Sequence, residues 1–322
     1  MDYRKPIKNS ATFALISREI EQNRLSHAYL ICSNDAKRLN AFCDMALCYS
    51  VYGKITDELV DKIERGGIAD IIRLPHDESV LTADIKEITD TVYFTPTEFS
   101  KKFYVINRAE TMNETAQNKL LKILEEPPAS VHIFLLADSE KNFLPTVLSR
   151  VKKIQLESLS SEEIVELLLA NGADEQSAYL AGALAGGSLS KAEEVISVHL
   201  HIEIYNAVIE MLKMMKTSRN VLRYSAHLMN FSANINEIID VIELVLADAM
   251  KASVGERAGL KFRSGVRDII EISTVYNYKV VIRLGEVFIR ARKRLALNGN
   301  VQSVLDELLF SMLEVKAKCL KS

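Results

Sequence analysis

The stretch that decides the fold runs from Thr111 to Pro128 and reads TMNETAQNKLLKILEEPP. Thr111 and Glu114 have the spacing of a capping box, in which two side chains satisfy free amides where a helix begins. Pro127 and Pro128 end the helix, because neither can donate a backbone hydrogen bond. Between these signals one apolar face recurs at helical spacing, formed by Ala116, Leu120, Ile123 and Leu124.

The polar residues of this segment, Gln117 among them, fall mostly on its other faces. The pattern therefore predicts an amphipathic helix over Glu114–Glu126 with one face against a core. The apolar run that follows the two prolines predicts a buried strand over Val131–Leu136.

Strands and helices alternate through the first half of the chain. The other expected strands are Tyr29–Cys32, Asp70–Leu74, Phe103–Ile106 and Lys153–Leu156. The other expected helices are Ala11–Gln22, Arg38–Tyr49 and Ile85–Tyr93. This alternation predicts an α/β fold with a mostly parallel sheet, covered by helices on both faces. Ligands of such sheets bind outside the carboxyl ends of the strands, so the turns after Cys32 and Ile106 are candidate sites.

Beyond Leu156 the strand pattern disappears and the chain reads as helical. Ser160 and Glu163 form a second capping-box pattern, and glycines at 172, 186 and 187 separate short helices. The predicted domains are an α/β domain over 1–157, a small helical domain over 158–199 and a larger helical domain over 200–322. The predicted fold class is thus α/β plus all-α.

Composition narrows the function. The 322 residues carry a formal charge of −3, which argues against a self-sufficient nucleic-acid binder. No apolar run of about 18 residues predicts a membrane span. The four cysteines lack C-x-x-C spacing, so we expect buried free thiols in a reducing cytoplasm.

Catalytic motifs are missing from the sequence. A phosphate-binding loop needs G-x-x-x-x-G-K-[ST], but the single Gly-Lys pair, Gly53-Lys54, is followed by Ile55. No zinc-protease, serine-hydrolase or dinucleotide-binding motif occurs either. These absences disfavour an enzyme in its own right.

Four segments in order carry a resemblance: HAYLI at 27–31, ETMNETAQNKLLKILEEPP at 110–128, LPTVLSR at 144–150 and GGSLSKA at 186–192. Together they resemble bacterial clamp-loader subunits of the AAA+ class. The resemblance implies an AAA+ parallel-sheet domain, a small helical lid and a C-terminal helical collar that joins an oligomer. It covers roughly residues 1–200.

The phosphate loop of the ATP-hydrolysing family members is degenerate in this chain. Ser33 and Arg38 stand where the resemblance expects the two glycines. Leu39 replaces the lysine, and Asn40 replaces the hydroxyl residue that binds magnesium. A backbone with bulky side chains cannot wrap phosphates as glycines do.

Two further family motifs are lost. Asn107-Arg108 replaces the Asp-Glu pair that serves magnesium and the attacking water, and Ser190 replaces an arginine that senses nucleotide in the lid. We therefore expect no cofactor and no ATP hydrolysis. The alternative is an autonomous AAA+ ATPase with an unconventional phosphate loop.

One family motif is kept. Ser149-Arg150 matches the family's Ser-Arg-Cys motif, with Val151 in place of the cysteine. The resemblance implies that Arg150 is an arginine finger, which acts in trans on the nucleotide of a neighbouring subunit, with Ser149 as its motif neighbour. The alternative is a strand-end arginine paired with a carboxylate.

Two other features are assigned structural roles. Many relatives carry a four-cysteine zinc module, but no cysteine lies in 49–70, so we expect no metal there and one short helix ending at Gly66-Gly67. A basic cluster predicts a solvated helix face with interhelix salt bridges rather than a phosphate-binding stripe; its members are Arg283, Arg290, Arg292, Lys293 and Arg294.

The resemblance also implies the partners. They are gamma or tau and delta subunits in a hetero-pentamer, with the sliding clamp and primed DNA reached through the assembly and no membrane contact. The expected location is the cytoplasm, at the nucleoid-associated replisome. A second alternative remains, the clamp-opening delta subunit, whose relatives expose hydrophobic clamp-binding residues on the first domain.

Overall fold

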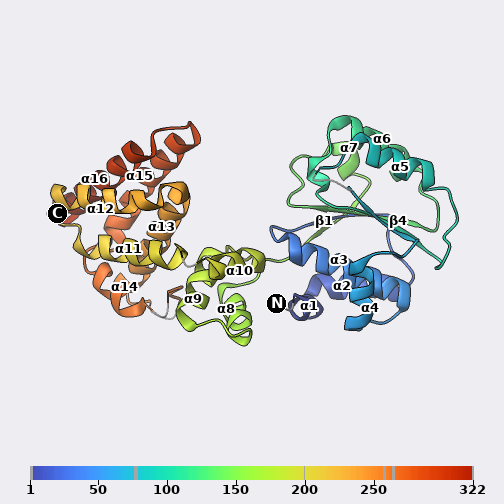
Figure 1. Cartoon of the computed structure of the whole chain (residues 1–322), viewed down its shortest axis with the longest axis horizontal. Coiled ribbons are helices and arrows are strands. Elements are labelled where there is room, and N and C mark those ends of the chain that lie inside the picture. The colour runs from blue at the N-terminus through green and yellow to red at the C-terminus, as the bar shows by residue number, and fades with distance from the viewer. Residues whose placement is uncertain (1–2, 76–78, 199, 257–258, 263–264, 321–322) are drawn as a thin grey trace. The chain divides into compact units, whose positions relative to one another are not determined.

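The computed structural model describes the chain except for residues 1–2, 76–78, 199, 257–258, 263–264 and 321–322. Internal contacts divide the chain into two units, Met1–Ser158 and Leu159–Ser322 (Figure 1). Each unit is described by itself. The predicted boundary near residue 200, within the second unit, stays a prediction.

The first unit contains a five-stranded sheet in which every neighbouring pair is parallel. The strand order is β2-β3-β4-β1-β5. The strands agree with the predicted ranges to within one residue at each end, and they are β1 (Ala28–Cys32), β2 (Ile71–Leu74), β3 (Lys102–Ile106), β4 (Val131–Ala137) and β5 (Lys152–Gln155). The α/β prediction for this half of the chain is confirmed.

Helices cover both faces of this sheet (Figure 1). One face packs against α1 (Arg4–Lys8), α2 (Ala11–Glu21), α3 (Ala36–Tyr52) and α4 (Asp57–Arg65). The other packs against α5 (Thr82–Thr91), α6 (Glu114–Glu125) and α7 (Pro145–Leu148). Alternate residues of one strand enter opposite cores, Tyr29 and Ile31 on the first face and Leu30 and Cys32 on the second. Burial on both faces explains why β1, β3 and β4 are apolar runs rather than alternating patterns.

The helix α6 begins at Glu114 as predicted and ends at Glu125, one residue before the predicted end, but its start is capped differently. Its N-cap is Asn113, whose side-chain oxygen accepts a hydrogen bond from the amide of Ala116 at 2.8 Å. The capping-box prediction for Thr111 was therefore wrong. Thr111 instead closes a short 3-10 turn over Ala109–Thr111, where its hydroxyl donates to the carbonyl of Arg108 and accepts from the amide of Val80.

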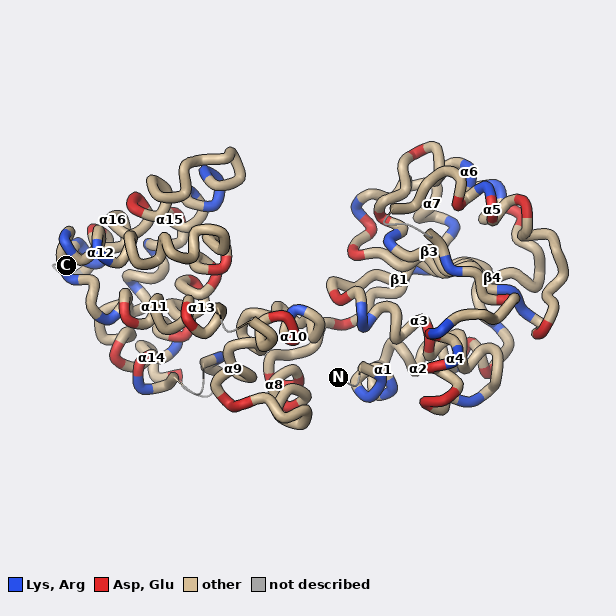
Figure 2. The backbone as a smooth tube through the Cα atoms, viewed as in Figure 1, with Lys and Arg blue, Asp and Glu red and all other residues tan. Residues whose placement is uncertain are grey.

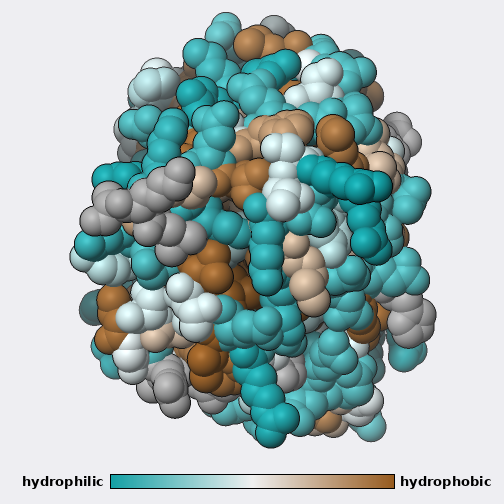
Figure 3. Space-filling view, turned by 90° about the vertical axis from the view of Figure 1, so that its left-hand side faces the viewer, coloured by the Kyte–Doolittle hydropathy of each residue, from teal (hydrophilic) through white to brown (hydrophobic). Residues whose placement is uncertain are grey.

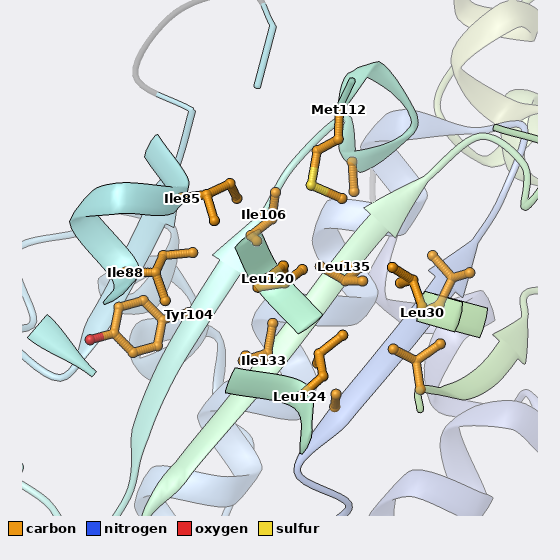
Figure 4. Close-up of a cluster of buried hydrophobic side chains, with 14 of the residues drawn as sticks. Leu30, Ile85, Ile88, Tyr104, Ile106, Met112, Leu120, Leu124, Ile133 and Leu135 are labelled. Carbon is orange, nitrogen blue, oxygen red and sulfur yellow. The ribbon is translucent and has the colours of Figure 1, made fainter. Parts of the chain in front are cut away.

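The apolar face of α6 lies where the sequence predicts. Leu120 and Leu124 point toward Ile133 and Leu135 of the central strand β4 (Figure 4). Both leucines are at most 2% exposed. This packing anchors α6 against the middle of the sheet.

The segment that stands in for a zinc module forms the helix α4, as predicted. Thr56 caps its start by accepting from the amide of Leu59, and Gly66 follows its last residue with φ of 77°. Positive φ at this place favours glycine, which has no Cβ to clash with the backbone.

Three of the four cysteines are buried free thiols. Burial raises the pKa of Cys32 to about 11 and the pKa of Cys43 to about 12, and it also raises the pKa of Cys48. Cys319 is only partly covered. The thiolate is the reactive form, so burial and raised pKa both slow alkylation.

We therefore expect a thiol reagent at pH 8 to label Cys319 rapidly in the native protein and the other three only after unfolding. Quantitative thiol titration with and without urea measures this directly. A Cys319→Ser variant is the control and should lose the fast phase. Fast labelling of three or four thiols in the native protein would contradict the burial.

The described residues of the second unit form helices and turns only. Ser160 and Glu163 make the predicted capping box, the hydroxyl accepting from the amide of Glu163 at 3.1 Å and the carboxylate accepting from the amide of Ser160 at 2.8 Å. The helices are α8 (Ser161–Ala170), α9 (Glu175–Leu184), α10 (Leu189–Ser197), α11 (Leu200–Met214), α12 (Ser218–Leu228), η2 (Met229–Asn234), α13 (Ile235–Ser253), α14 (Val266–Ser273), α15 (Tyr278–Ala296) and α16 (Val301–Leu320). The prediction of an all-helical remainder is confirmed.

The basic cluster of α15 makes salt bridges between helices, as predicted. Arg292 pairs with Asp240 at 2.7 Å and with Glu243, both on α13, and Arg294 pairs with Glu307 of α16. Lys, Arg, Asp and Glu positions are interspersed over both units (Figure 2). Two of the basic side chains of α15 therefore link this helix to α13 and α16.

Within the described ranges, no single helix is long and apolar enough for a membrane span. The consecutive helices α10 and α11 are long and apolar enough only when they are counted together, and the chain bends by 83° between them.

Candidate functional site

The carboxyl ends of the central strands border a hollow of about 230 Å³. Segments after β1, β3 and β4 line it, which is where ligands of parallel sheets bind. It brings together five of the residues singled out in the sequence, namely Ser33, Leu39, Asn40, Asn107 and Arg108. Its volume lies below the roughly 300–1,000 Å³ of ordinary small-molecule sites.

A buried carboxylate occupies the start of the helix behind this hollow. Asp35 is the N-cap of α3, is 1% exposed and accepts a hydrogen bond from the amide of Arg38 at 3.0 Å. The hydroxyl of Ser33 accepts in turn from the amide of Asp35 at 3.1 Å. A helix N-terminus attracts a phosphate through its free amides and positive dipole end, and here the protein's own anion sits there.

Arg38 does not supply positive charge to the hollow. It is 5% exposed, its guanidinium donates to the carbonyl of Glu157, and it is absent from the lining.

Acidic residues line the hollow beside the lost motif. Glu110 and Asp138 contribute two carboxylates, whereas Arg108 is the one basic residue among the described lining residues. The side-chain oxygen of Asn107 is also buried without a described hydrogen-bond partner. The described lining thus carries one more acidic than basic side chain, which disfavours a polyphosphate. Sequence reasoning missed both acids, although each follows a strand end.

Ser190 belongs to the second unit, where it lies in the first turn of α10. Its predicted role as a lost nucleotide sensor stays a prediction. No cluster of three or more His, Cys, Asp or Glu side chains in the described part of the chain is arranged to hold a metal ion.

Arg150 lies between α7 and β5, where its side chain is 35% exposed. One guanidinium nitrogen donates to the carbonyl of Thr146 at 3.0 Å and to the hydroxyl of Ser149 at 3.1 Å. The other pairs with Glu125 at 2.9 Å, at the last residue of α6. The predicted alternative, an arginine paired with a carboxylate, is therefore what the single chain contains.

Arg150 and the hollow lie at opposite edges of the sheet. Because β5 runs parallel to β1, with Lys152 opposite Tyr29, Arg150 lies two residues before β5, at the amino ends of the strands. The hollow lies at their carboxyl ends. One subunit therefore presents Arg150 on a different side from its own degenerate loop.

A buried amide positions the segment that leads to Arg150. Gln117 of α6 is 2% exposed, so its assignment to an outer face was wrong. Its amide nitrogen donates to the carbonyls of Met112 at 3.1 Å and Asn142 at 2.9 Å, and its oxygen accepts from the amide of Leu144 at 2.8 Å. Leu144 is the N-cap of α7, so Gln117 joins α6 to the turn that carries Arg150.

Comparisons with known proteins show which proteins this chain is similar to. The family model described as "DNA polymerase III, delta subunit" matches residues 8–160. The delta-prime subunit of Bacillus subtilis DNA polymerase III is 24% identical over 318 residues, which is 93% of this chain and 94% of that protein. The gamma subunit of Buchnera aphidicola from Schizaphis graminum is 27% identical over 222 residues, and the match spans 63% of this chain and 60% of that protein.

Among solved structures, a gamma-subunit-related protein from Thermotoga maritima aligns with a TM-score of 0.45 and 18% identity, covering 95% of this chain and 99% of that one. Over residues 8–160 the chain is similar to this family of DNA polymerase III subunits, as the clamp-loader resemblance of the sequence leads us to expect. The similarity to the delta-prime subunit extends over nearly the full length of both chains.

Proposed function

We propose that this chain is the non-hydrolysing stator subunit of a sliding-clamp loader. In this proposal it docks against an ATP-bound gamma or tau subunit and offers Arg150 to that neighbour's nucleotide. A delta subunit and the helical collar complete a hetero-pentamer, which loads the clamp onto primed DNA in the cytoplasm. The relationship to delta-prime supports the assembly, and the opposite placement of Arg150 and the hollow supports action in trans.

The main support for the stator role is that carboxylates surround the place where active subunits bind phosphate. Asp35 occupies the start of α3, and Glu110 and Asp138 add two further carboxylates around the hollow. A nucleotide there would meet negative charge where active subunits offer glycine amides and a lysine. This chain would then contribute rigidity and one catalytic group rather than turnover of its own.

Accordingly, we expect no measurable ATP binding by the purified chain at micromolar nucleotide. Equilibrium dialysis with labelled ATP and magnesium measures this, with a gamma or tau subunit from the same organism as positive control. Micromolar affinity would favour the rival function, an autonomous AAA+ ATPase with an unconventional phosphate loop.

Assembly is tested by mixing the full chain with gamma or tau and delta subunits from the same organism. The expected product is one discrete complex that contains all three kinds of subunit, whose stoichiometry native mass spectrometry counts. A chain that fails to enter any complex with these subunits would contradict the proposed function.

One observation keeps the delta subunit as a second candidate. Tyr93 and Phe94, just after α5, are 62% and 64% exposed, and they form an adjacent aromatic pair on the first unit. Exposed large apolar neighbours of this kind mark protein-binding sites. A pull-down of the sliding clamp by this chain alone separates the two: strong capture that Tyr93→Ala/Phe94→Ala abolishes would favour delta.

A further inference from the structure

An apolar row runs along the outer face of α15. Ile282, Ile289 and Ala296 recur every seven residues, which aligns them along one line of a helix. Ile282 is 67% exposed and Ile289 is 68% exposed. Apolar side chains also break the hydrophilic surface in patches on the side of the molecule seen in Figure 3.

This row lies opposite the face that α15 buries. The inward residues are Val280, Leu284, Val287, Phe288 and Ala291, which pack where α15 meets α13 and α16. At 100° per residue, Ile282 and Ile289 project from the other side of the helix. The fold of this unit therefore leaves the row without a partner among the described residues.

A glycine lies between the two isoleucines on the same face. A Cβ built at Gly285 meets nothing within 4 Å, so the core does not require a glycine there. Glycine in the middle of a helix costs roughly 0.5–1 kcal/mol relative to alanine. A second helix packed across Gly285 would use the space, because the missing side chain lets two backbones approach closely.

The charges beside the row are mostly positive. Lys279, Arg290 and Lys293 are exposed and have no ion pair among the described residues, and Glu286 is the one exposed acid on this stretch. Two copies of the face would bring like charges together, which is unfavourable. The complementary surface is a helix with an apolar stripe and acidic residues along its sides.

We propose that this outer face of α15, which we call the Ile282 row (Tyr278, Ile282, Gly285, Ile289, Ala296), docks an acidic amphipathic helix of another clamp-loader subunit. The inference rests on the proposed function for the origin of that helix. Burial of Ile282 and Ile289 supplies the apolar contact. The side chains of Lys279, Arg290 and Lys293 favour a partner helix with acidic residues beside its apolar stripe.

The test uses the full chain and a purified gamma or tau subunit from the same organism. Ile282→Asp/Ile289→Asp places two charges in the row, and Leu222→Asp, at a residue 57% exposed on α12 of the same unit, is the matched control. We expect the double variant to weaken association at least tenfold and the control to change it less than twofold. Both variants should keep the unfolding midpoint of the wild type, because all three positions are exposed.

A second pair of variants tests the charge. Lys279→Glu/Lys293→Glu should weaken the same association and reduce its dependence on salt, whereas Glu286→Gln should leave it intact or strengthen it. If the Ile282→Asp/Ile289→Asp variant binds gamma or tau with an affinity within twofold of wild type, docking at the Ile282 row is contradicted. The proposed clamp-loader function is unaffected by that result. Wild-type self-association that this variant abolishes would contradict this docking too, since the occupant would then be a second copy. A wild type that binds neither gamma nor tau would overturn the proposed function together with the row.

Discussion

Arg150→Ala is expected to slow DNA-stimulated ATP hydrolysis at the neighbouring subunit's site by about 10³-fold or more, the range of arginine fingers that act in trans. In the proposed role the guanidinium neutralises charge that develops on the transferred phosphoryl group, and alanine would remove both the charge and the paired donors. Turnover of the reconstituted loader, in which only the gamma or tau neighbour of this chain is competent for hydrolysis, measures the effect at that site.

Two variants make this result specific. Arg150→Lys keeps a positive charge but lacks the planar fork, so we expect it to recover only part of the rate. Glu125→Gln removes the ion pair that holds Arg150 in the single chain. Exposed pairs contribute at most about 1 kcal/mol, so this variant should alter turnover less than about fivefold. Arg150→Ala that assembles normally and hydrolyses ATP at the wild-type rate would remove the finger assignment.

Gln117→Leu is expected to lower the free energy of unfolding by about 2–4 kcal/mol. Leucine has a similar volume but leaves the buried carbonyl of Met112, the part-buried carbonyl of Asn142 and the amide of Leu144 without their side-chain partner. Each unsatisfied buried polar group costs about 1–3 kcal/mol, and partial relaxation brings the sum below simple addition. Urea denaturation of the full chain measures the change through the midpoint and slope.

Asn118→Leu is the matched control, because it removes the same kind of amide from an exposed position of the same helix. We expect it to change stability by no more than about 0.5 kcal/mol. Equal losses for the two variants would show that the buried hydrogen bonds of Gln117 are not the cause. In the assembled loader, Gln117→Leu should also reduce turnover, since the segment from Asn142 to Arg150 loses its anchor.

Much of the fold follows from local patterns. The strands β1, β3 and β4 are short apolar runs, and glycine or proline follows the ends of α4 and α6, so each of these elements can be recognised without knowledge of the rest of the chain. The residue that caps α6 was mistaken because Thr111 and Asn113 both have side chains able to cap a helix. The 3-10 turn after β3 engages Thr111, and only Asn113 remains to cap.

The candidate site was less accessible to sequence reasoning. The lost phosphate motif is visible in Ser33, Leu39 and Asn40, but its replacement by an internal carboxylate depends on where Asp35 points. Glu110 and Asp138 are distant in sequence and meet only because β3 and β4 are neighbours in the sheet. The buried role of Gln117 escaped notice because helical periodicity places it near the edge of the apolar face.

The sequence by itself indicated the class of protein and determined the alternation of strands and helices, the loss of the phosphate loop and the retention of Arg150. These depend on residue identity and spacing along the chain, which local propensity and motif order express directly. Only the tertiary structure shows what the stretch TMNETAQNKLLKILEEPP contributes near Arg150. The buried side-chain amide of Gln117 holds the segment that leads to Arg150, and the carboxylate of Glu125 pairs with its guanidinium. The tertiary structure also decided that Arg150 and the hollow face opposite edges of the sheet, because strand order and direction arise from packing between segments far apart in the chain.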